Sequence, residues 1–140
     1  MSAEGSPRSL TQPPQAELAA APSFRVVDIT EAVDDAVQAA GVTEGLACVY
    51  SPTTGNIVRL HELESGLLED FVRLLQRLVP AGDPGRRASL IAMLIGPAGE
   101  VVPVSGGRLA LGQWQRVLLI VLSEEAGQTE PAWLVHAVGS

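Results

Sequence analysis

Short apolar segments separated by turn residues constrain the fold of this chain more than any other feature. The segments are rich in Val, Ile and Leu, and none approaches the ~18 residues of a membrane-spanning helix. Gly, Pro, Asn and Ser lie between them, which is typical of strands joined by turns. We therefore expect strands at residues 24–29, 46–50, 57–60, 101–104, 108–111, 114–122 and 132–138.

Two longer segments have helical periodicity instead. Apolar residues recur at three- and four-residue spacing from Thr30, the expected N-cap, to Gly41, the expected stop. A second apolar stripe runs from Ser65, another expected N-cap, to Pro80. Residues 88–95 lack a clear period, but their Ala, Leu and Met content favours a third, short helix. Short-turn strands with two or three inserted helices predict an α+β fold around a mostly antiparallel sheet.

Composition changes sharply near residue 23. Residues 1–22 contain four prolines together with Ser, Gln and Ala, without sustained apolar periodicity. Such a segment cannot bury enough apolar surface to offset its ordering entropy, so it is predicted to be a disordered tail. The remainder, residues 23–140, is long enough for a single globular domain with its own core.

The charge balance excludes a basic surface. The chain carries a net charge of −7 and has no lysine, which is a poor match for nucleic acid. No segment suits a membrane span or a secretory signal, so we expect a cytoplasmic protein that binds neither nucleic acid nor membrane. Cys48 is the single cysteine and lies in the apolar run 46–50, which predicts a small buried residue rather than a nucleophile.

Groups for metal or acid–base chemistry are scarce. A transition-metal site generally needs three or more imidazole, carboxylate or thiolate ligands, and His61 and His136 are the only histidines, so we expect no metal and no cofactor. Alternation in the last strand places His136 and Trp133 on opposite faces of the sheet. This position is expected for a histidine that is hydrogen-bonded or exposed at a sheet edge. His61 lies near Glu62 and Glu64, which favours a solvated loop, and no spacing assigns any of the three a catalytic role.

The stretch 106–115, Gly-Gly-Arg-Leu-Ala-Leu-Gly-Gln-Trp-Gln, looks like the rim of a binding site. A glycine-flanked turn leads there to a tryptophan at the mouth of a buried strand. Trp114 offers a stacking surface for an aromatic ligand, and Gln113 and Gln115 offer amide contacts. The alternatives are that Trp114 packs in the core or between subunits, and that the two glycines form a plain turn.

Two further groups suit an anion. Thr53 and Thr54 supply hydroxyls, and the backbone amides of their turn can converge on an anion. The planar guanidinium groups of Arg86 and Arg87 suit phosphate, although a solvated helix start and an ordinary β-turn would have the same sequences. The candidate residues for binding a small phosphorylated or anionic ligand are therefore Thr53, Thr54, Arg86, Arg87, Gln113, Trp114 and Gln115.

Four segments occur in the order found in a known family. They are Thr53-Thr54, the helix from Leu67-Leu68-Glu69-Asp70 to Leu78-Val79-Pro80, Ala-Met-Leu-Ile-Gly-Pro at 92–97, and the stretch 107–115. From about residue 24 to its end the chain thus resembles the YjbQ-like family, described as secondary thiamine-phosphate synthase enzymes. The resemblance implies a β-sandwich or partly open barrel with flanking helices, assembled as a homotrimer. It also implies a pocket near the subunit boundaries, where histidines hold a metal or contact an anion.

The chain departs from this family where the family has histidines. Pro52 replaces a histidine before the Thr-Thr pair, and residues 84–89 lack the two histidines and the aspartate of the family's His-Asn-Ala-Asp-Ala-His stretch. Trp114 and Gln115 are retained. Within the homotrimer that the resemblance implies, these losses favour binding of a small phosphate or other anion, with reduced or lost catalysis. An active thiamine-phosphate-forming enzyme, a structural trimer whose N-terminal tail recruits a partner, and a metal held by three copies of one histidine stay open as alternatives.

Overall fold

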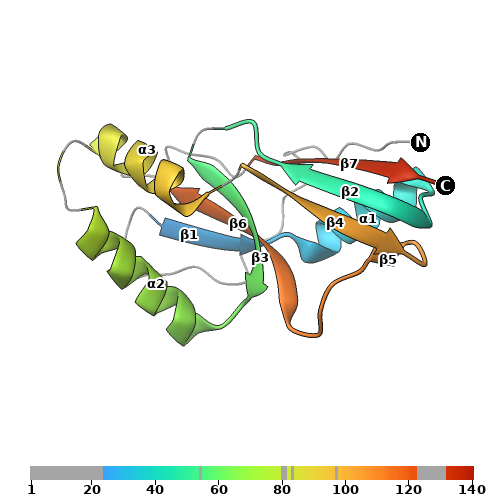
Figure 1. Ribbon diagram of the computed structural model, residues 1–140, viewed down its shortest axis with the longest axis horizontal. Helices are drawn as coiled ribbons and strands as arrows, with labels where there is room; N and C mark the ends of the chain where they lie inside the picture. The colour runs from blue at the N-terminus through green and yellow to red at the C-terminus, as the bar shows by residue number, and fades with distance from the viewer. Residues whose placement is uncertain (1–23, 54, 80–81, 83, 97, 123–131) are drawn as a thin grey trace.

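The computed structural model describes residues 24–53, 55–79, 82, 84–96, 98–122 and 132–140. These residues form a three-stranded and a four-stranded antiparallel sheet with three helices (Figure 1). The predicted α+β, mostly antiparallel fold is confirmed, and the two sheets do not close into a barrel. The elements are β1 (Phe24–Asp28), α1 (Thr30–Ala40), β2 (Glu44–Tyr50), β3 (Asn56–Glu62), α2 (Ser65–Leu78), α3 (Pro84–Ile95), β4 (Gly99–Ser105), β5 (Arg108–Leu109), β6 (Gln115–Leu122) and β7 (Leu134–Gly139).

Strand β6 is the centre of the three-stranded sheet, whose order is β1-β6-β3. One face of this sheet packs against α2 and α3, with Ile57, Leu68 and Ile91 in the shared core. The opposite face packs against α1 and the four-stranded sheet. Because both faces are covered, residues 117–122 are all buried, and the apolar run is continuous rather than alternating.

The four-stranded sheet, of order β5-β4-β2-β7, has one buried and one exposed face. In β2 the inward residues Ala47 and Val49 are buried, whereas Leu46, Cys48 and Tyr50 point outward. The predicted burial of Cys48 is therefore wrong: its thiol belongs to an exposed residue. Strand alternation, rather than the apolar character of the whole run, decides which residues are covered.

The start of α1 differs from the prediction that Thr30 is its N-cap. Ile29 occupies the cap position, and its side chain accepts no hydrogen bond from the helix. Thr30 is the first helical residue, and its hydroxyl donates instead to the Asp28 carboxylate at 2.6 Å. A hydroxyl committed to this buried contact is not available for the backbone amides of the first turn.

The start of α2 also has a different cap from the predicted Ser65. The Glu64 carboxylate accepts hydrogen bonds from the backbone amides of Gly66 (2.9 Å) and Leu67 (2.7 Å). A carboxylate satisfies two amides at once and interacts favourably with the helix dipole, so it displaces the neighbouring hydroxyl. The third helix, predicted at 88–95, is confirmed and begins earlier, at Pro84.

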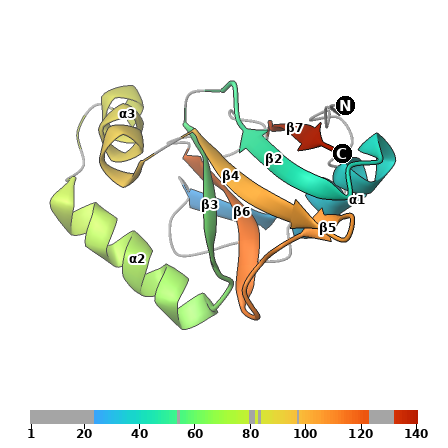
Figure 2. The same cartoon turned by 45° about the vertical axis from the view of Figure 1, so that its right-hand side comes forward.

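Figures 1 and 2 place α2 and α3 next to each other at one end of the molecule and the four-stranded sheet at the other. No helix among the described residues is long and apolar enough to cross a membrane. The predicted tail at residues 1–22 lies outside the described residues. Its disorder, and a single domain at residues 23–140, stay predictions.

Candidate functional site

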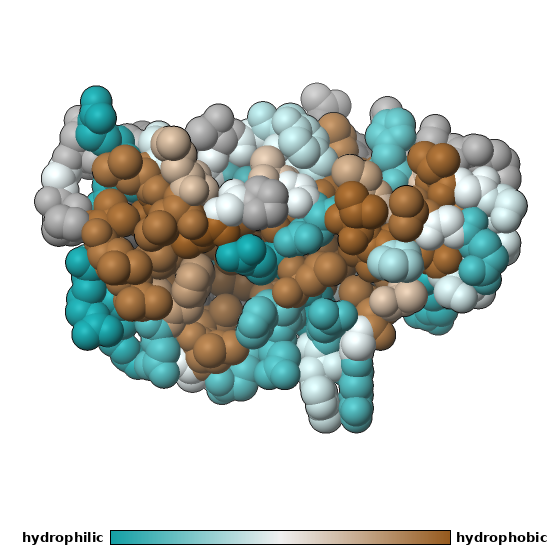
Figure 3. All heavy atoms as spheres, viewed as in Figure 1, coloured by the Kyte–Doolittle hydropathy of each residue, from teal (hydrophilic) through white to brown (hydrophobic). Residues whose placement is uncertain are grey.

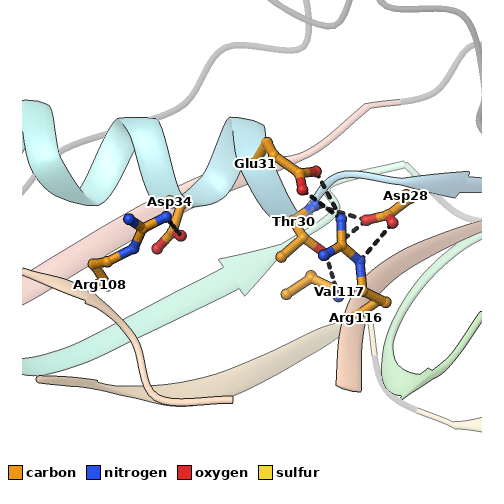
Figure 4. Close-up of polar contacts among 7 residues, drawn as sticks. All are labelled: Asp28, Thr30, Glu31, Asp34, Arg108, Arg116 and Val117. Atoms are coloured by element: carbon orange, nitrogen blue, oxygen red, sulfur yellow. Dashed lines mark hydrogen bonds and ion pairs between the residues drawn. The ribbon is translucent and has the colours of Figure 1, made fainter. Parts of the chain in front are cut away.

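A buried carboxylate organises the end of the three-stranded sheet where β1 leads into α1 (Figure 4). The Asp28 side chain is 1% exposed and accepts hydrogen bonds from the Thr30 amide at 3.0 Å and the Thr30 hydroxyl at 2.6 Å. The Thr30 hydroxyl in turn accepts a hydrogen bond from the Val117 amide on β6 at 2.8 Å. These contacts fix the chain direction at the junction of β1, α1 and β6.

Arg116 joins this network from β6. Its Nε donates to Asp28 at 2.7 Å, and its Nη2 donates to both carboxylate oxygens of Glu31, at 2.6 and 2.8 Å. The pKa of Arg116 is raised above its ordinary value, mainly by the hydrogen bond to Glu31 and also by the bond to Asp28, although partial burial opposes the shift. Arg116 is therefore a fixed cation, held between two carboxylates.

An open pocket of about 470 Å³ lies beside this network. Gln113, Trp114 and Arg116 line it from the β6 side. Asp28 lines it from the end of β1, and Glu62, Leu63 and Glu64 line it from the connection between β3 and α2. The volume falls within the range typical of small-molecule sites. Because three carboxylates face one guanidinium, the pocket itself carries an acidic charge balance.

Trp114 is 67% exposed at this pocket. The alternative that it packs in the core of the protomer is therefore wrong, whereas packing between subunits remains a prediction. The adjacent turn is held in place by Gln115, whose side-chain oxygen accepts from the Gly112 amide at 2.8 Å. The predicted rim thus borders the pocket, which is lined by Gln113 and Trp114.

The glycines that begin the rim segment form a tight turn between β4 and β5. Gly106 and Gly107 have φ values of 60° and 79°, which glycine adopts without the steric penalty other residues meet. Asp34 on α1 anchors the strand that follows, since its carboxylate accepts from the Leu109 amide at 2.8 Å and from Arg108 at 3.2 Å (Figure 4). This part of the rim segment has a structural role.

The predicted anion-binding residues lie elsewhere. Thr53 is half-buried in the turn between β2 and β3; its amide donates to the Ser51 hydroxyl at 3.3 Å, and its carbonyl accepts from the Asn56 amide at 3.0 Å. Thr54 lies outside the described residues. Arg86 and Arg87 belong to the first turns of α3, where Arg86 is exposed and the Arg87 Nε donates to the Val79 carbonyl at 3.0 Å.

Strand β3 separates the predicted site residues. The Thr53 turn leads into its first residue, Asn56, whereas its last residue, Glu62, pairs with Gln115. At about 3.3 Å per residue, the two ends of this strand are about 20 Å apart. Within one protomer the structure therefore brings Gln113, Trp114 and Gln115 together but not with Thr53.

Two buried N–H donors near the Thr53 turn were missed by sequence reasoning. The Nε of Arg25 and the Nε1 of Trp133 are buried without a hydrogen-bond partner among the residues that the structure describes, and Trp133 is 1% exposed. Arg25 and Asn56 both pair with Val121 of β6, and the side-chain Nδ2 of Asn56 donates to the carbonyl of Ala132 at 3.5 Å, which places both donors at this end of the sheets. The sequence signal that could have revealed Arg25 is the presence of an arginine within a strand predicted from β-branched residues.

The Asp28–Arg116 pair was also missed, because its partners are 88 positions apart in the sequence. Both histidines are exposed, and His136 lies on the outer face of β7 as predicted. Among the described residues, no group of three or more His, Cys, Asp or Glu side chains is arranged to hold a metal ion.

Comparison with known proteins agrees with this fold. A family model described as "UPF0047 protein YjbQ-like" matches residues 15–135. A UPF0047 protein of Archaeoglobus fulgidus is 39% identical over 111 residues, covering 74% of this chain and 85% of that protein. A UPF0047 protein of Mycobacterium tuberculosis is 34% identical over 110 residues, covering 72% of this chain and 80% of its own length.

Solved structures show the same similarity. A hypothetical protein of Aeropyrum pernix superposes with a TM-score of 0.76 at 28% identity, covering 100% of this chain and 99% of that chain. A YbjQ-like protein of unknown function from Sulfolobus solfataricus superposes with a TM-score of 0.72 at 26% identity, covering 84% and 88%. Because the family model spans most of the sequence and the fold agrees, this chain belongs to the YjbQ-like UPF0047 protein family.

Proposed function

We propose that the protein is a homotrimer that binds a small phosphorylated or anionic ligand at the boundary between subunits. The pocket beside Trp114 is the observation that carries this proposal, because an exposed indole there lines a hollow of ligand size. Trp114 and Gln113 would hold the organic part of the ligand by stacking and amide contacts. The anionic part needs other donors, since Asp28, Glu62 and Glu64 line the same pocket.

The anion-binding donors would come from a neighbouring protomer. Thr53, Thr54, Arg86 and Arg87 supply hydroxyl and guanidinium groups, and Thr53 lies at the far end of β3 from Trp114 within one chain. A neighbouring subunit would therefore have to supply Thr53 to the Trp114 pocket.

We further propose that catalysis is reduced or lost. Pro52 and the segment 84–89 replace the family's histidines and aspartate, which leaves His61 and His136 as the chain's imidazoles. General acid–base chemistry near neutral pH relies on such groups. A direct product assay with the two thiamine-phosphate precursors tests this part, and turnover at rates typical of enzymes, on the order of 1 per second or faster, would contradict it.

Binding is tested by thermal shift with matched pairs of probes. AMP against adenosine, and thiamine phosphate against thiamine, differ only in the phosphate, and inorganic phosphate reports the anion alone. We expect at least one phosphorylated probe to raise the melting temperature above the effect of its dephosphorylated partner. Trp114→Ala and Arg86→Gln should each abolish that difference, whereas Gln38→Glu on the exposed side of α1 should not. No stabilisation by any probe at millimolar concentration would refute the binding proposal.

Mixing two deficient chains tests the subunit boundary. A Trp114→Ala chain retains Arg86, and an Arg86→Gln chain retains Trp114, so after subunit exchange some boundaries contain both residues. We expect the mixture to regain part of the AMP-dependent shift that each variant lacks alone. If the mixed chains form trimers but show no AMP-dependent shift in melting temperature, the site lies within one protomer and the proposal is contradicted.

A further inference from the structure

A thiol and an imidazole lie on neighbouring strands of the four-stranded sheet. Cys48 on β2 is directly opposite His136 on β7 in the strand register, and both residues are exposed. The residues before and after each of them, such as Ala47 and Val135, are buried in the core on the other side of the sheet. Because side chains alternate along a strand, the thiol and the imidazole therefore share the outer face.

The strand register sets the spacing of this pair. Directly opposite residues of an antiparallel pair have Cβ atoms about 4.5–5.5 Å apart. Bonds of about 2.3 Å to a thiolate and about 2.0 Å to an imidazole, the values for zinc, put the two donor atoms about 4 Å apart when one ion joins them. The sulfur is one bond from its Cβ and the nearer ring nitrogen is two bonds from its own. Rotation of the two side chains alone therefore suffices to place both donors on one ion.

The number of ligands restricts the class of ion that this pair can hold. Divalent transition metals generally take three or four protein ligands. Among the described residues, no group of three or more His, Cys, Asp or Glu side chains is arranged to hold an ion, so the pair stands without a third ligand from that part of the chain. A monovalent d¹⁰ ion such as Cu(I) is complete with two ligands in a linear arrangement, and it prefers soft thiolate donors. The pair therefore fits Cu(I) better than zinc.

The surroundings of the pair also favour a monovalent ion. Figure 3 shows hydrophobic side chains gathered over β2 and β4. The neighbours of the pair on the outer face are apolar or aromatic, namely Leu46, Tyr50, Val101, Leu134 and Val138. When Cu(I) binds a thiolate, their opposite charges cancel, and a neutral unit lies among these side chains. A divalent ion would leave a net positive charge there, which apolar surroundings disfavour.

We propose that Cys48 and His136 form a two-ligand binding site for Cu(I) on the outer face of the four-stranded sheet. On binding, the thiol proton passes to the solvent, the sulfur forms one bond to the ion, and a nitrogen of His136 forms the second; no electron is transferred. An imidazole has two nitrogens, so metal binding through one leaves the other for the further interaction that His136 makes. The site is separate from the Trp114 pocket and independent of the ligand proposed there.

Competition with bicinchoninate, a coloured Cu(I) chelator, tests the site under anaerobic conditions, and native mass spectrometry counts the bound ions. We expect wild type to bind one Cu(I) per chain and Cys48→Ser to bind none. His136→Gln should weaken binding at least about tenfold, whereas His61→Gln, the matched control on β3, should not change it. All three side chains are exposed, so each variant should keep the wild-type melting temperature.

A displaced histidine tests whether the strand register is responsible. Val101 lies opposite Cys48 on its other neighbour, β4, so Val101→His should restore binding in the His136→Gln background. Ser105→His places the imidazole on the same face of β4 but about 13 Å further along the strand, and it should not restore binding.

Three results would overturn the proposal. Equal affinities of wild type and His136→Gln, or one ion shared between two chains, would show that the thiol binds copper without its strand partner. Failure of Val101→His to restore binding, or equal recovery with Ser105→His, would show that the affinity does not follow the register. Absence of any bound Cu(I) in wild type would remove the site itself, whatever the outcome of the phosphate-binding experiments.

Discussion

Replacing Arg116 with methionine tests whether the buried network at the β1–α1 junction stabilises the fold. The side chain is 32% exposed, whereas the Asp28 carboxylate it contacts at 2.7 Å is 1% exposed. Removing one member of a buried ion pair typically costs 3–5 kcal/mol, because the other charge loses its compensation. Since Thr30 still donates two hydrogen bonds to Asp28, we expect the lower end, about 3 kcal/mol, in the free energy of unfolding.

The matched control is Arg73→Met. Arg73 contacts Asp70 at 2.8 Å on the exposed side of α2, and its pKa is also raised, mainly by that hydrogen bond. Because both side chains are solvated, we expect no measurable loss of stability. Urea unfolding followed by tryptophan fluorescence gives the free energy and the midpoint for both variants. For a chain of this size, a loss of about 3 kcal/mol corresponds to a melting temperature lower by about 10 °C.

The pH dependence and a second substitution sharpen the test. The folded pKa of Arg116 is raised, so its contribution is fully present below the unfolded value and is lost only as pH rises through the folded one. The difference between wild type and Arg116→Met should therefore stay constant from about pH 7 to about pH 9. Asp28→Asn in the Arg116→Met background should recover about 1 kcal/mol, since no uncompensated carboxylate remains. Equal effects of Arg116→Met and Arg73→Met would refute this reasoning.

Three further predictions concern single positions. Gly45→Ala should destabilise by about 3 kcal/mol in urea unfolding, because its Cβ would clash with the Val138 carbonyl, whereas Gly82→Ala, with nothing within 4 Å, should change little. Glu64→Ala should cost about 1 kcal/mol as the true cap of α2, and an equal loss for Ser65→Ala would contradict this assignment. Cys48 should react rapidly with a thiol reagent in the folded chain because it is exposed on the outer face of β2, and a rate no faster than that of global unfolding would contradict this placement.

The secondary structure was predictable where a segment has one clear hydrophobic pattern. The buried run at 117–122 and the apolar stripe of α2 stood out because each has a single hydrophobic pattern. The helix ends were harder to predict, since Thr30 and Glu64 are drawn to partners that the local sequence does not reveal. Cys48 shows the same limit, because a short apolar run does not say which of its residues face outward.

The site was predictable only in pieces. The rim around Trp114 follows from local sequence, and the structure places it beside a pocket. The relation between Trp114 and Thr53 depends instead on which strands pair, and β3 holds them at its opposite ends. Asp28 and Arg116 could not be linked from the sequence, because nothing in either segment indicates the register of β1 against β6.

The acidic lining of the Trp114 pocket sets the strictest condition on any anionic ligand. A phosphate placed there meets Glu62, Glu64 and Asp28, while Arg116 is already held by two carboxylates. Two like charges about 6 Å apart repel by about 3 kcal/mol at an effective dielectric constant of about 20, so one protomer alone would disfavour the phosphate. Arginines from a neighbouring subunit would make the electrostatic energy of the phosphate in this pocket favourable. Diluting the protein until the proposed trimer dissociates should therefore remove the preference for AMP over adenosine even though the Trp114 pocket is intact, and a monomer that keeps this preference would show that one chain holds the whole site.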